Sequence, residues 1–503
     1  MDKIIVVDYG SQYTRLLARR IREFGVYSQV ESPENVSVMP DTVGIILSGG
    51  PASVYLKDAP QVNTDLLEKG IPLLGICYGM QLLAKVFGGK IARGRTFEYG
   101  LTSVETFDSK IFNNLPEKIS SWMSHGDTVQ KLPEGFTLTA KSENGIIAGF
   151  ESKEKNIYAL QFHPEVSQTE YGNEIIKNFL FGVCKAKPEW KIDDFVEAKI
   201  KEIKKTVSNS KVIGAISGGI DSTVATVLVS KAVGENLVPI FVDHGLLREE
   251  DIAVPKVLTQ MGIKVKVVDA SRLFFRRLEG VEDPEEKRKI IGKLFIEVFE
   301  KEAKSIKAEY LLQGTIYSDV IESACSSAFS SRIKSHHNVG GLPDLMYLKL
   351  IEPLRELFKD EVRDIGKLLN ISNELLNRQP FPGPGLAIRI IGEVTPEKVK
   401  ILRSVDHIML EILKETGEYD KIWQAFAVLL PVRSVGVKGD KRAYDYVVTL
   451  RAVDSLEGMT ASWHMMPYEI LRKISSKITD EIPEVGRIVY DVTDKPPATI
   501  EWE

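Results

Sequence analysis

The hydrophobic positions at the start of the chain fall into short apolar runs that alternate with amphipathic stretches. Such runs predict buried strands at 4–7, 43–47, 72–76 and 157–162. Helical periodicity predicts helices at 15–24, 81–87 and 174–183. This alternation favours a mostly parallel sheet that is covered on both faces. The charged, proline-broken segment 185–190 predicts a boundary, so we place a first domain at residues 1–189.

The same alternation resumes after that boundary. Apolar runs predict strands at 212–216, 238–242, 265–268 and 311–314. Helices are predicted at 192–207 and 222–233, and the long charged stretch 274–307 is mostly helical. The pattern predicts a second parallel α/β domain at residues 190–378.

The composition changes at residues 378–385, RQPFPGPG, where proline and glycine alternate. No regular element tolerates that alternation. Helices are then predicted at 397–416 and 468–482, with β-rich runs at 425–437, 444–452 and 488–492. We therefore predict an α+β third domain at residues 379–503. The expected fold class is α/β, with two parallel-sheet domains followed by this α+β domain.

Composition narrows the class of protein further. A chain of 503 residues is too long for one ordinary core, and its net charge of −5 gives no electrostatic case for a nucleic-acid partner. The three cysteines lie far apart, which disfavours a disulfide framework and fits a reducing compartment. The sequence has neither a signal-peptide pattern nor an apolar run that would span a bilayer. We expect a cytoplasmic protein without membrane or nucleic-acid partners.

A candidate nucleophile lies between a predicted strand and a predicted helix. Cys77 stands in the segment 75–79, GICYG, with a glycine two residues away on each side. A tight strand-to-helix turn that projects one side chain needs such small flanking residues. The helix N-terminus also favours a thiolate. A lone cysteine is more often a small buried apolar residue, but the flanking glycines weaken that alternative.

A histidine and a carboxylate follow the predicted strand 157–162. His163 and Glu165 lie two residues apart, so they can serve as a base and the group that orients it. Together with the cysteine segment, the segment 161–165, QFHPE, resembles the class I glutamine amidotransferases over roughly residues 1–189. The resemblance implies that Cys77 attacks the amide carbonyl of glutamine, that His163 shuttles the proton and that Glu165 orients His163.

The same resemblance implies further contacts to glutamine. It assigns the oxyanion hole to the backbone N–H groups of Gly50 and Tyr78. It makes Gln81, one helical turn beyond the nucleophile, a contact to the glutamine side chain. The family also matches the segment SHGD, in which His125 and Asp127 are candidate substrate or domain-interface residues.

A second candidate site follows the predicted strand 212–216. The segment 217–223, SGGIDST, opens a helix, and its glycines, hydroxyls and helix N-terminus suit a phosphate. The segment lacks the lysine of a Walker A loop, so it is not built for γ-phosphate transfer. The alternative without a binding function is a Gly/Ser turn with an aspartate near a helix N-cap. The segment resembles the SGGxDS loop of enzymes that split ATP into AMP and pyrophosphate.

That resemblance assigns ATP and pyrophosphate binding to consecutive residues: Ser217, Gly218, Gly219, Ile220, Asp221, Ser222 and Thr223. Asp221 suits a Mg²⁺ ion that bridges to the pyrophosphate, so Mg²⁺ is the expected cofactor and ATP a co-substrate. In such enzymes an oxygen attacks the α-phosphate of ATP, and ammonia then displaces AMP from the adenylate. An upstream ammonia source and a downstream adenylating domain would make one coherent reaction.

Later segments distinguish among the families that share this loop. Residues 314–323, 334–341, 380–386 and 495–503 resemble the glutamine-hydrolysing GMP synthase family. The resemblance implies that xanthosine monophosphate contacts Arg288, Gln424, Lys495, Ile500 and Glu501. It also implies that the third domain mediates homodimerisation, although the apolar run 426–432 fits an interface or an interior strand equally well. One departure is Ser318, where the family usually has proline, and this change removes no functional group.

Other functions are compatible with parts of this sequence. A glutamine-dependent NAD synthetase would share the phosphate loop, but that family typically carries a nitrilase-like amidase. A regulatory module with a decayed site would have lost the nucleophile or the loop. A tRNA-modifying enzyme would need a basic surface, which the acidic balance disfavours. The adjacent His336 and His337 do not share a helix face, so they are unsuited to a metal pair.

Overall fold

The computed structural model describes residues 1–320, 348–438, 440–455 and 460–503. It divides into two compact units, Met1–Asp194 and Phe195–Glu503, and each is described by itself. The whole segment 334–341, with His336 and His337, and the last three residues of the segment 314–323 lie outside the described residues. Within the described part, no helix is both long enough and apolar enough to span a membrane.

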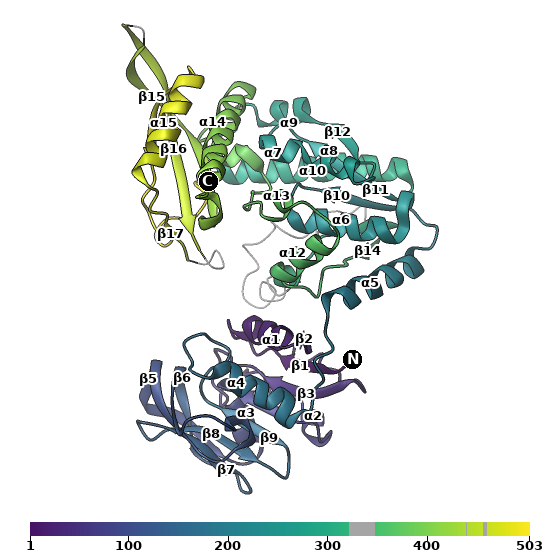
Figure 1. The fold of residues 1–503 in the computed structure, drawn as a ribbon, viewed down its shortest axis with the longest axis vertical. Coiled ribbons are helices and arrows are strands. Elements are labelled where there is room, and N and C mark those ends of the chain that lie inside the picture. Colours follow the sequence, from purple (N-terminus) through teal and green to yellow (C-terminus); the bar gives the residue numbers. More distant parts are fainter. Residues whose placement is uncertain (321–347, 439, 456–459) are drawn as a thin grey trace. The chain divides into compact units, whose positions relative to one another are not determined.

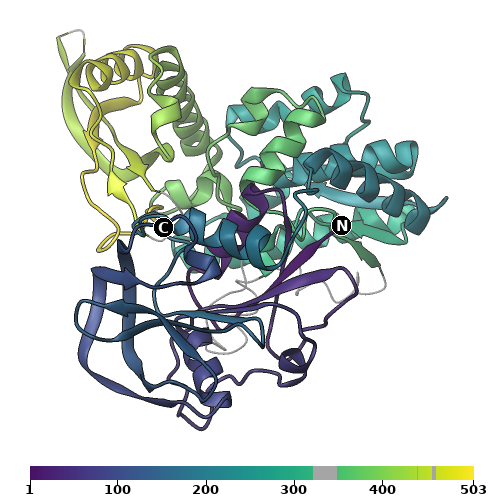
Figure 2. The same ribbon diagram turned by 60° about the horizontal axis from the view of Figure 1, so that its bottom comes forward.

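The first unit is built on a nine-stranded sheet in the order β2-β1-β3-β4-β9-β8-β7-β5-β6 (Figures 1 and 2). Parallel pairing joins β1 (Lys3–Val7), β2 (Tyr27–Glu31), β3 (Thr42–Leu47), β4 (Leu73–Ile76) and β9 (Ile157–Leu160). Antiparallel pairing joins the other four, β5 (Lys90–Thr106), β6 (Lys118–Lys131), β7 (Thr137–Ser142) and β8 (Ile147–Ser152). Strand β8 also pairs antiparallel with β9 and so connects the two parts.

Helices of the first unit bury apolar faces against this sheet. They are α1 (Thr14–Glu23), α2 (Asp65–Glu68), α3 (Tyr78–Val86) and α4 (Gly172–Lys177), with a 3₁₀ turn at Lys110–Phe112 and a π-helical turn at Asn178–Val183. Helix α3 is buried from Tyr78 to Ala84 and packs with Ile5 and Leu47 of the parallel strands. The predicted helix 81–87 therefore begins earlier, at Tyr78, because it starts directly after the turn at Cys77.

The carboxyl ends of the parallel strands meet at one edge of the sheet. That edge carries the residues after β1, after β3 and after β9, together with Cys77 after β4. The chain runs from β1 to β2 on one side and returns to β3 on the other, so the strand order reverses between β1 and β3. Open α/β sheets bind ligands in the crevice at such a reversal.

The second unit contains a parallel five-stranded sheet in the order β12-β11-β10-β13-β14. Its strands are β10 (Val212–Ile216), β11 (Leu237–Asp243), β12 (Lys266–Asp269), β13 (Tyr310–Leu312) and β14 (Lys349–Ile351). The described helices before the C-terminal part of this unit are α5 (Ile192–Val207), which starts at the boundary, α6 (Ile220–Val233), α7 (Glu249–Ile252), α8 (Val254–Gln260), α9 (Ser271–Leu278), α10 (Pro284–Ile306), α12 (Lys359–Leu368) and α13 (Asn373–Leu376). The strand order reverses between β10 and β13, which again predicts a ligand site there.

An antiparallel hairpin dominates the C-terminal part of this unit (Figure 1). It is formed by β15 (Gln424–Lys438) and β16 (Lys441–Asp454), and β16 also pairs with β17 (Ser462–Trp463) and β18 (Val485–Tyr490). Helix α14 (Pro396–Glu415) contacts β15 and also packs against α15 (Tyr468–Glu481), which contacts β18. A 3₁₀ turn at Gly385–Arg389 follows the Pro/Gly-rich segment.

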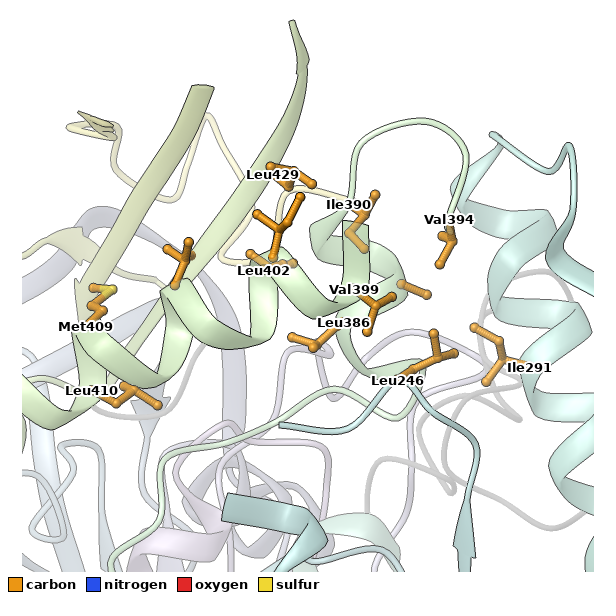
Figure 3. Packing of buried hydrophobic residues seen from close by; sticks show 14 of the residues in the cluster. Leu246, Ile291, Leu386, Ile390, Val394, Val399, Leu402, Met409, Leu410 and Leu429 are labelled. Carbon is orange, nitrogen blue, oxygen red and sulfur yellow. The ribbon is translucent and has the colours of Figure 1, made fainter. Parts of the chain in front are cut away.

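One hydrophobic cluster runs through both sheets of the second unit (Figure 3). It joins Ile213 of β10 and Ile291 of α10 to Leu402 and Met409 of α14, and onward to Leu429 of β15. Residues on both sides of the predicted boundary at 378–379 therefore share a core. The three-domain division remains a prediction, whereas the predicted α/β fold class is confirmed.

Candidate active site

Cys77 occupies a sharp turn between β4 and α3. It is the N-cap residue of α3, and its φ of 52° lies where non-glycine residues are uncommon. The Cys77 N–H donates to the Leu160 carbonyl at 2.7 Å, which ties the turn to the end of β9. A strained strand-to-helix turn of this kind is typical of a nucleophile elbow, which exposes its central side chain above the sheet.

Two glycines make this turn possible because neighbouring backbone fills the space that a side chain would need. A Cβ atom on Gly79 would lie 2.3 Å from the Leu47 carbonyl oxygen, and one on Gly75 would lie 2.7 Å from the Gly79 backbone. The Gly79 N–H also donates to the Ser48 carbonyl at 3.0 Å. The glycine spacing in the sequence thus reflects the close approach of α3 to the end of β3.

His163 and Glu165 form a buried pair next to this turn. The Nδ1 atom of His163 lies 2.8 Å from Oε1 of Glu165, and the two side chains are 4% and 2% exposed. Burial alone would lower the pKa of His163. The Glu165 carboxylate and a hydrogen bond with Cys77 outweigh burial, so they raise that pKa well above its usual value. Because Glu165 holds Nδ1, Nε2 is the nitrogen left to exchange a proton with Cys77.

A cavity of about 690 Å³ lies over the nucleophile, a volume that suits a small molecule. Its lining includes most of the residues predicted for this site, namely Gly50, Cys77, Tyr78, Gln81, His125, Asp127 and His163. Gln81 Nε2 donates to the Asp127 carbonyl at 3.1 Å, which links the helix residue to the SHGD segment. Glu165 contacts the cavity only through His163.

Two further residues at this site were not predicted. Gln161 directs its Nε2 to the Cys77 sulfur at 3.6 Å. Glu98 lies 3.1 Å from Nε2 of His125, and both side chains are 1% exposed. Burial would raise the pKa of Glu98, but hydrogen bonds from His125 and two other side chains lower it overall. No sequence motif marks Glu98, because it meets His125 only through the pairing of β5 with β6.

The predicted phosphate loop follows β10 at the strand-order reversal of the second sheet. Gly219 is the N-cap of α6, and Gly218 has a φ of +84° that favours glycine. The hydroxyls of Ser222 and Thr223 donate to the Gly219 carbonyl at 3.0 and 2.9 Å. A Cβ atom on Gly314, just after β13, would lie 2.9 Å from the Ser222 nitrogen. The chain just after β13 therefore lies in close contact with the first turn of α6.

Asp221 of this loop meets a cation that was not predicted. The Nζ atom of Lys359, the first residue of α12, lies 2.5 Å from Asp221 Oδ2. The other oxygen, Oδ1, is buried without a hydrogen-bond partner among the described residues. These residues are 138 positions apart, so only the fold brings them together.

This arrangement fits a Mg²⁺ ion that is held largely by phosphate. Mg²⁺ commonly takes one or two carboxylates and completes its shell with phosphate oxygens and water. The described residues contain no cluster of three or more ligand side chains that would form an all-protein metal site. The unpartnered oxygen of Asp221 would give such an ion one protein ligand beside the phosphate loop.

Several residues predicted to bind the nucleotide gather around the C-terminal segment. Gln424, the first residue of β15, donates from Nε2 to Glu501 Oε1 at 2.9 Å. Arg288 of α10 donates to the main-chain oxygen of Glu503. Ile500 packs with a small apolar cluster that includes Phe426.

Lys495 and the rest of this segment are positioned mainly by polar contacts. The Lys495 N–H donates to the Ala461 carbonyl at 2.7 Å. Buried Arg451, which was not predicted, donates to the carbonyls of Thr493 and Thr499 at 2.6 and 3.1 Å. The segment carrying these predicted residues thus depends on side chains from the sheet beneath it.

Family models match three parts of the chain. The glutamine amidotransferase class-I model covers residues 5–183, the NAD synthase model covers residues 190–288, and the GMP synthase C terminal domain model covers residues 411–502. The NAD synthase match contains the phosphate loop and ends well before the C-terminal match. It therefore accounts for one part of the chain only.

Relatives match the chain from end to end. The GMP synthase [glutamine-hydrolyzing] of Petrotoga mobilis is 56% identical over 100% of both chains. The protein of the same name from Thermotoga maritima is 58% identical over 99% of this chain and 100% of its own, and that from Aquifex aeolicus is 54% identical over 99% of both. These matches favour the reaction of that family over the NAD synthetase alternative.

Replacing Gly79 with alanine tests the elbow. Gly79→Ala places a methyl group against the Leu47 carbonyl, so we expect the free energy of unfolding to fall by about 1–3 kcal/mol. The rate at which iodoacetamide alkylates Cys77 should also change, because the added methyl group forces the turn at Cys77 to shift. The matched control is Gly182→Ala, since a Cβ atom there meets nothing within 4 Å. Denaturant unfolding with equal losses in both variants would contradict the steric argument.

Replacing Glu165 with glutamine tests the electrostatics of the pair. Without the carboxylate the pKa of His163 falls, so the imidazolium that stabilises a Cys77 thiolate is lost at lower pH. We expect alkylation of Cys77 at pH 7 to slow by about tenfold or more. Mass spectrometry of the Cys77 peptide across a pH series measures this, with exposed Glu154→Gln as the control. An unchanged pH profile in Glu165→Gln would refute the proposed coupling.

Proposed function

The chain belongs to the family of glutamine-hydrolysing GMP synthases, and on that premise we propose that it converts xanthosine monophosphate to GMP. Glutamine supplies the nitrogen, ATP activates the nucleotide, and water hydrolyses glutamine. The other products are glutamate, AMP and pyrophosphate. The observation that carries the proposal is the presence of two complementary sites in one chain, a buried Cys-His-Glu triad and a phosphate loop without a Walker A lysine.

The triad performs the hydrolysis of glutamine in this proposal. Cys77 attacks the amide carbonyl, and His163 carries the thiol proton to the leaving ammonia, which leaves a glutamyl thioester on Cys77. Water then hydrolyses this thioester, which releases glutamate and restores the thiol. Glu165 keeps His163 in the required tautomer and stabilises its charged form. The backbone N–H groups of Gly50 and Tyr78 receive the developing oxyanion. The contacts of Gln81 and the cavity around it support its role in binding glutamine.

The phosphate loop performs the activation step. The 2-oxygen of the xanthine ring attacks the α-phosphate of ATP, and pyrophosphate leaves from the loop formed by residues 217–223. Ammonia then attacks the ring carbon that bears this oxygen, and AMP departs with the oxygen. Backbone N–H groups at the start of α6 would hold the pyrophosphate. The hydroxyls of Ser222 and Thr223 would have to turn to it from the Gly219 carbonyl, and Lys359 would add a positive charge.

Xanthosine monophosphate would bind through Arg288, Gln424, Lys495, Ile500 and Glu501. The link between Gln424 and Glu501 and the anchoring of Arg288 at Glu503 support a common site for these residues. We accordingly assign the amidotransferase to residues 1–189, the adenylating domain to 190–378 and the C-terminal domain to 379–503.

Mg²⁺ is the proposed cofactor, and Asp221 is its proposed protein ligand. When bound, Mg²⁺ would neutralise the charge of ATP and of the departing pyrophosphate. Chelation should abolish GMP formation while leaving glutaminase activity measurable, and added Mg²⁺ should restore GMP formation. Full activity in the presence of excess chelator would exclude this cofactor.

The oligomeric state and the cellular location of the protein are further parts of the proposal. We propose a homodimer formed by the C-terminal domain, because exposed apolar side chains, including Val432, Val435 and Val437, lie along the β15–β16 hairpin. Sedimentation equilibrium of the full chain at micromolar concentration would test it, and a monomer would refute it. We propose a cytoplasmic location, which cell fractionation would test.

Replacing the nucleophile separates the two sites. Cys77→Ala should abolish GMP formation from glutamine, because the enzyme can no longer form the thioester. GMP formation from high concentrations of ammonium should persist within about twofold, because the adenylating residues are untouched. Steady-state assays with each nitrogen source measure this outcome. Loss of both activities in a folded Cys77→Ala variant would contradict a two-site synthase.

A further inference from the structure

We propose that Arg389 is a positioning residue for nucleotide binding and that it acts through Glu501, a role that rests on the proposed function. Arg389 is the last residue of the 3₁₀ turn that follows the Pro/Gly-rich segment. It is not one of the site residues predicted from the sequence. Its side chain is 1% exposed, so it is a buried cation that needs a partner. Its position suggests that it orients Glu501 rather than touching the nucleotide.

Arg389 and Glu501 form a bidentate pair. The Arg389 Nε atom donates to Glu501 Oε2 at 3.0 Å, and Nη2 donates to Oε1 at 2.8 Å. Two parallel bonds between planar groups fix the plane of the carboxylate as well as its position. Lysine, as a single point charge, would neutralise Glu501 without fixing that plane.

Aromatic rings in turn fix the guanidinium. The carbon at the centre of the Arg389 guanidinium lies 4.0 Å from the Phe426 ring centroid and 5.2 Å from that of Phe381. Nη1 of Arg389 is buried without a hydrogen-bond partner among the described residues. A buried donor left unsatisfied has an energetic cost, which the paired bonds to Glu501 and the packing against the two rings must offset.

The bonds to Glu501 leave it able to accept one more donor. A carboxylate has about four acceptor positions in total. Oε1 accepts from Arg389 and from Gln424, whereas Arg389 is the one donor to Oε2 among the residues that the structure describes. The Glu501 side chain is 19% exposed, so the carboxylate is only partly covered by the residues that bind it. We infer that Oε2 receives an N–H or O–H donor of the bound nucleotide.

The location of Glu501 makes such support necessary. Residues 491–503 contain no helix or strand beyond the isolated bridge at Lys495. Segments without a regular hydrogen-bond ladder are held by side chains or remain mobile. Arg451 holds the carbonyls before Glu501, and Arg389 holds its carboxylate. Arg389 therefore supplies two of the three side-chain hydrogen bonds that the described residues make to this carboxylate.

The test compares Arg389→Lys, Glu501→Gln and the double variant in ammonium-dependent GMP formation. Arg389→Lys should raise the KM for xanthosine monophosphate by about tenfold or more, with the KM for ATP unchanged within about twofold. Glu501→Gln should raise the same KM, and the double variant should be no worse than Glu501→Gln alone. Exposed Arg472→Lys on α15 is the matched control and should behave as the wild type.

Two results would overturn the role of Arg389. One is a double variant whose increase in KM for xanthosine monophosphate equals the product of the increases in the two single variants. Residues that act through one another should not have such independent effects. The other is an equal loss for ATP and the nucleotide together with a lower melting temperature, which a merely structural residue would produce. If Arg389→Lys fails to fold, equilibrium binding of xanthosine monophosphate to Glu501→Gln still tests the open acceptor. Wild-type protein that makes no GMP would refute the proposed function instead.

Discussion

Parallel pairing of buried strands is the constraint on which both sites depend. In each unit the parallel strands end at one edge, and the chain must leave that edge through loops before it returns along a helix. Those loops place Cys77 after β4 and the phosphate loop after β10. Strand order reverses next to β10 in the second unit and one strand away from β4 in the first unit. Such a reversal creates a crevice, and the reactive groups lie beside it. The chemistry therefore occupies positions that the sheet topology creates.

Close backbone approach is the second requirement, and glycine satisfies it at both sites. Gly79 lies against the Leu47 carbonyl, whereas Gly314 lies against the start of α6. In both places a strand end and the first turn of a helix are too close for a side chain between them. The result is a rigid turn that aims one reactive group, a thiol in the first unit and a set of N–H and hydroxyl donors in the second.

Buried charges are paired in ways that serve different ends. The Glu165 carboxylate raises the pKa of His163, and the protonated imidazole keeps a proton beside Cys77. Lys287, Arg389 and Arg451 instead hold an irregular segment at Glu503, Glu501 and the Thr493 carbonyl. Removing one partner from such a pair leaves an uncompensated charge, which typically costs several kcal/mol. The order of the C-terminal segment thus depends on electrostatics more than on secondary structure.

The sequence by itself determined the α/β class, the order of most strands and helices, and the motifs around Cys77, His163 and Asp221. Those features are local, because periodicity, glycine spacing and short motifs act over a few residues. Only the tertiary structure decided that Lys359 meets Asp221, that Glu98 meets His125 and that Arg389 meets Glu501. These pairs join residues on separate elements, so no local pattern marks them. Burial makes each such contact consequential, and the chain's path through space alone determines which groups are buried together.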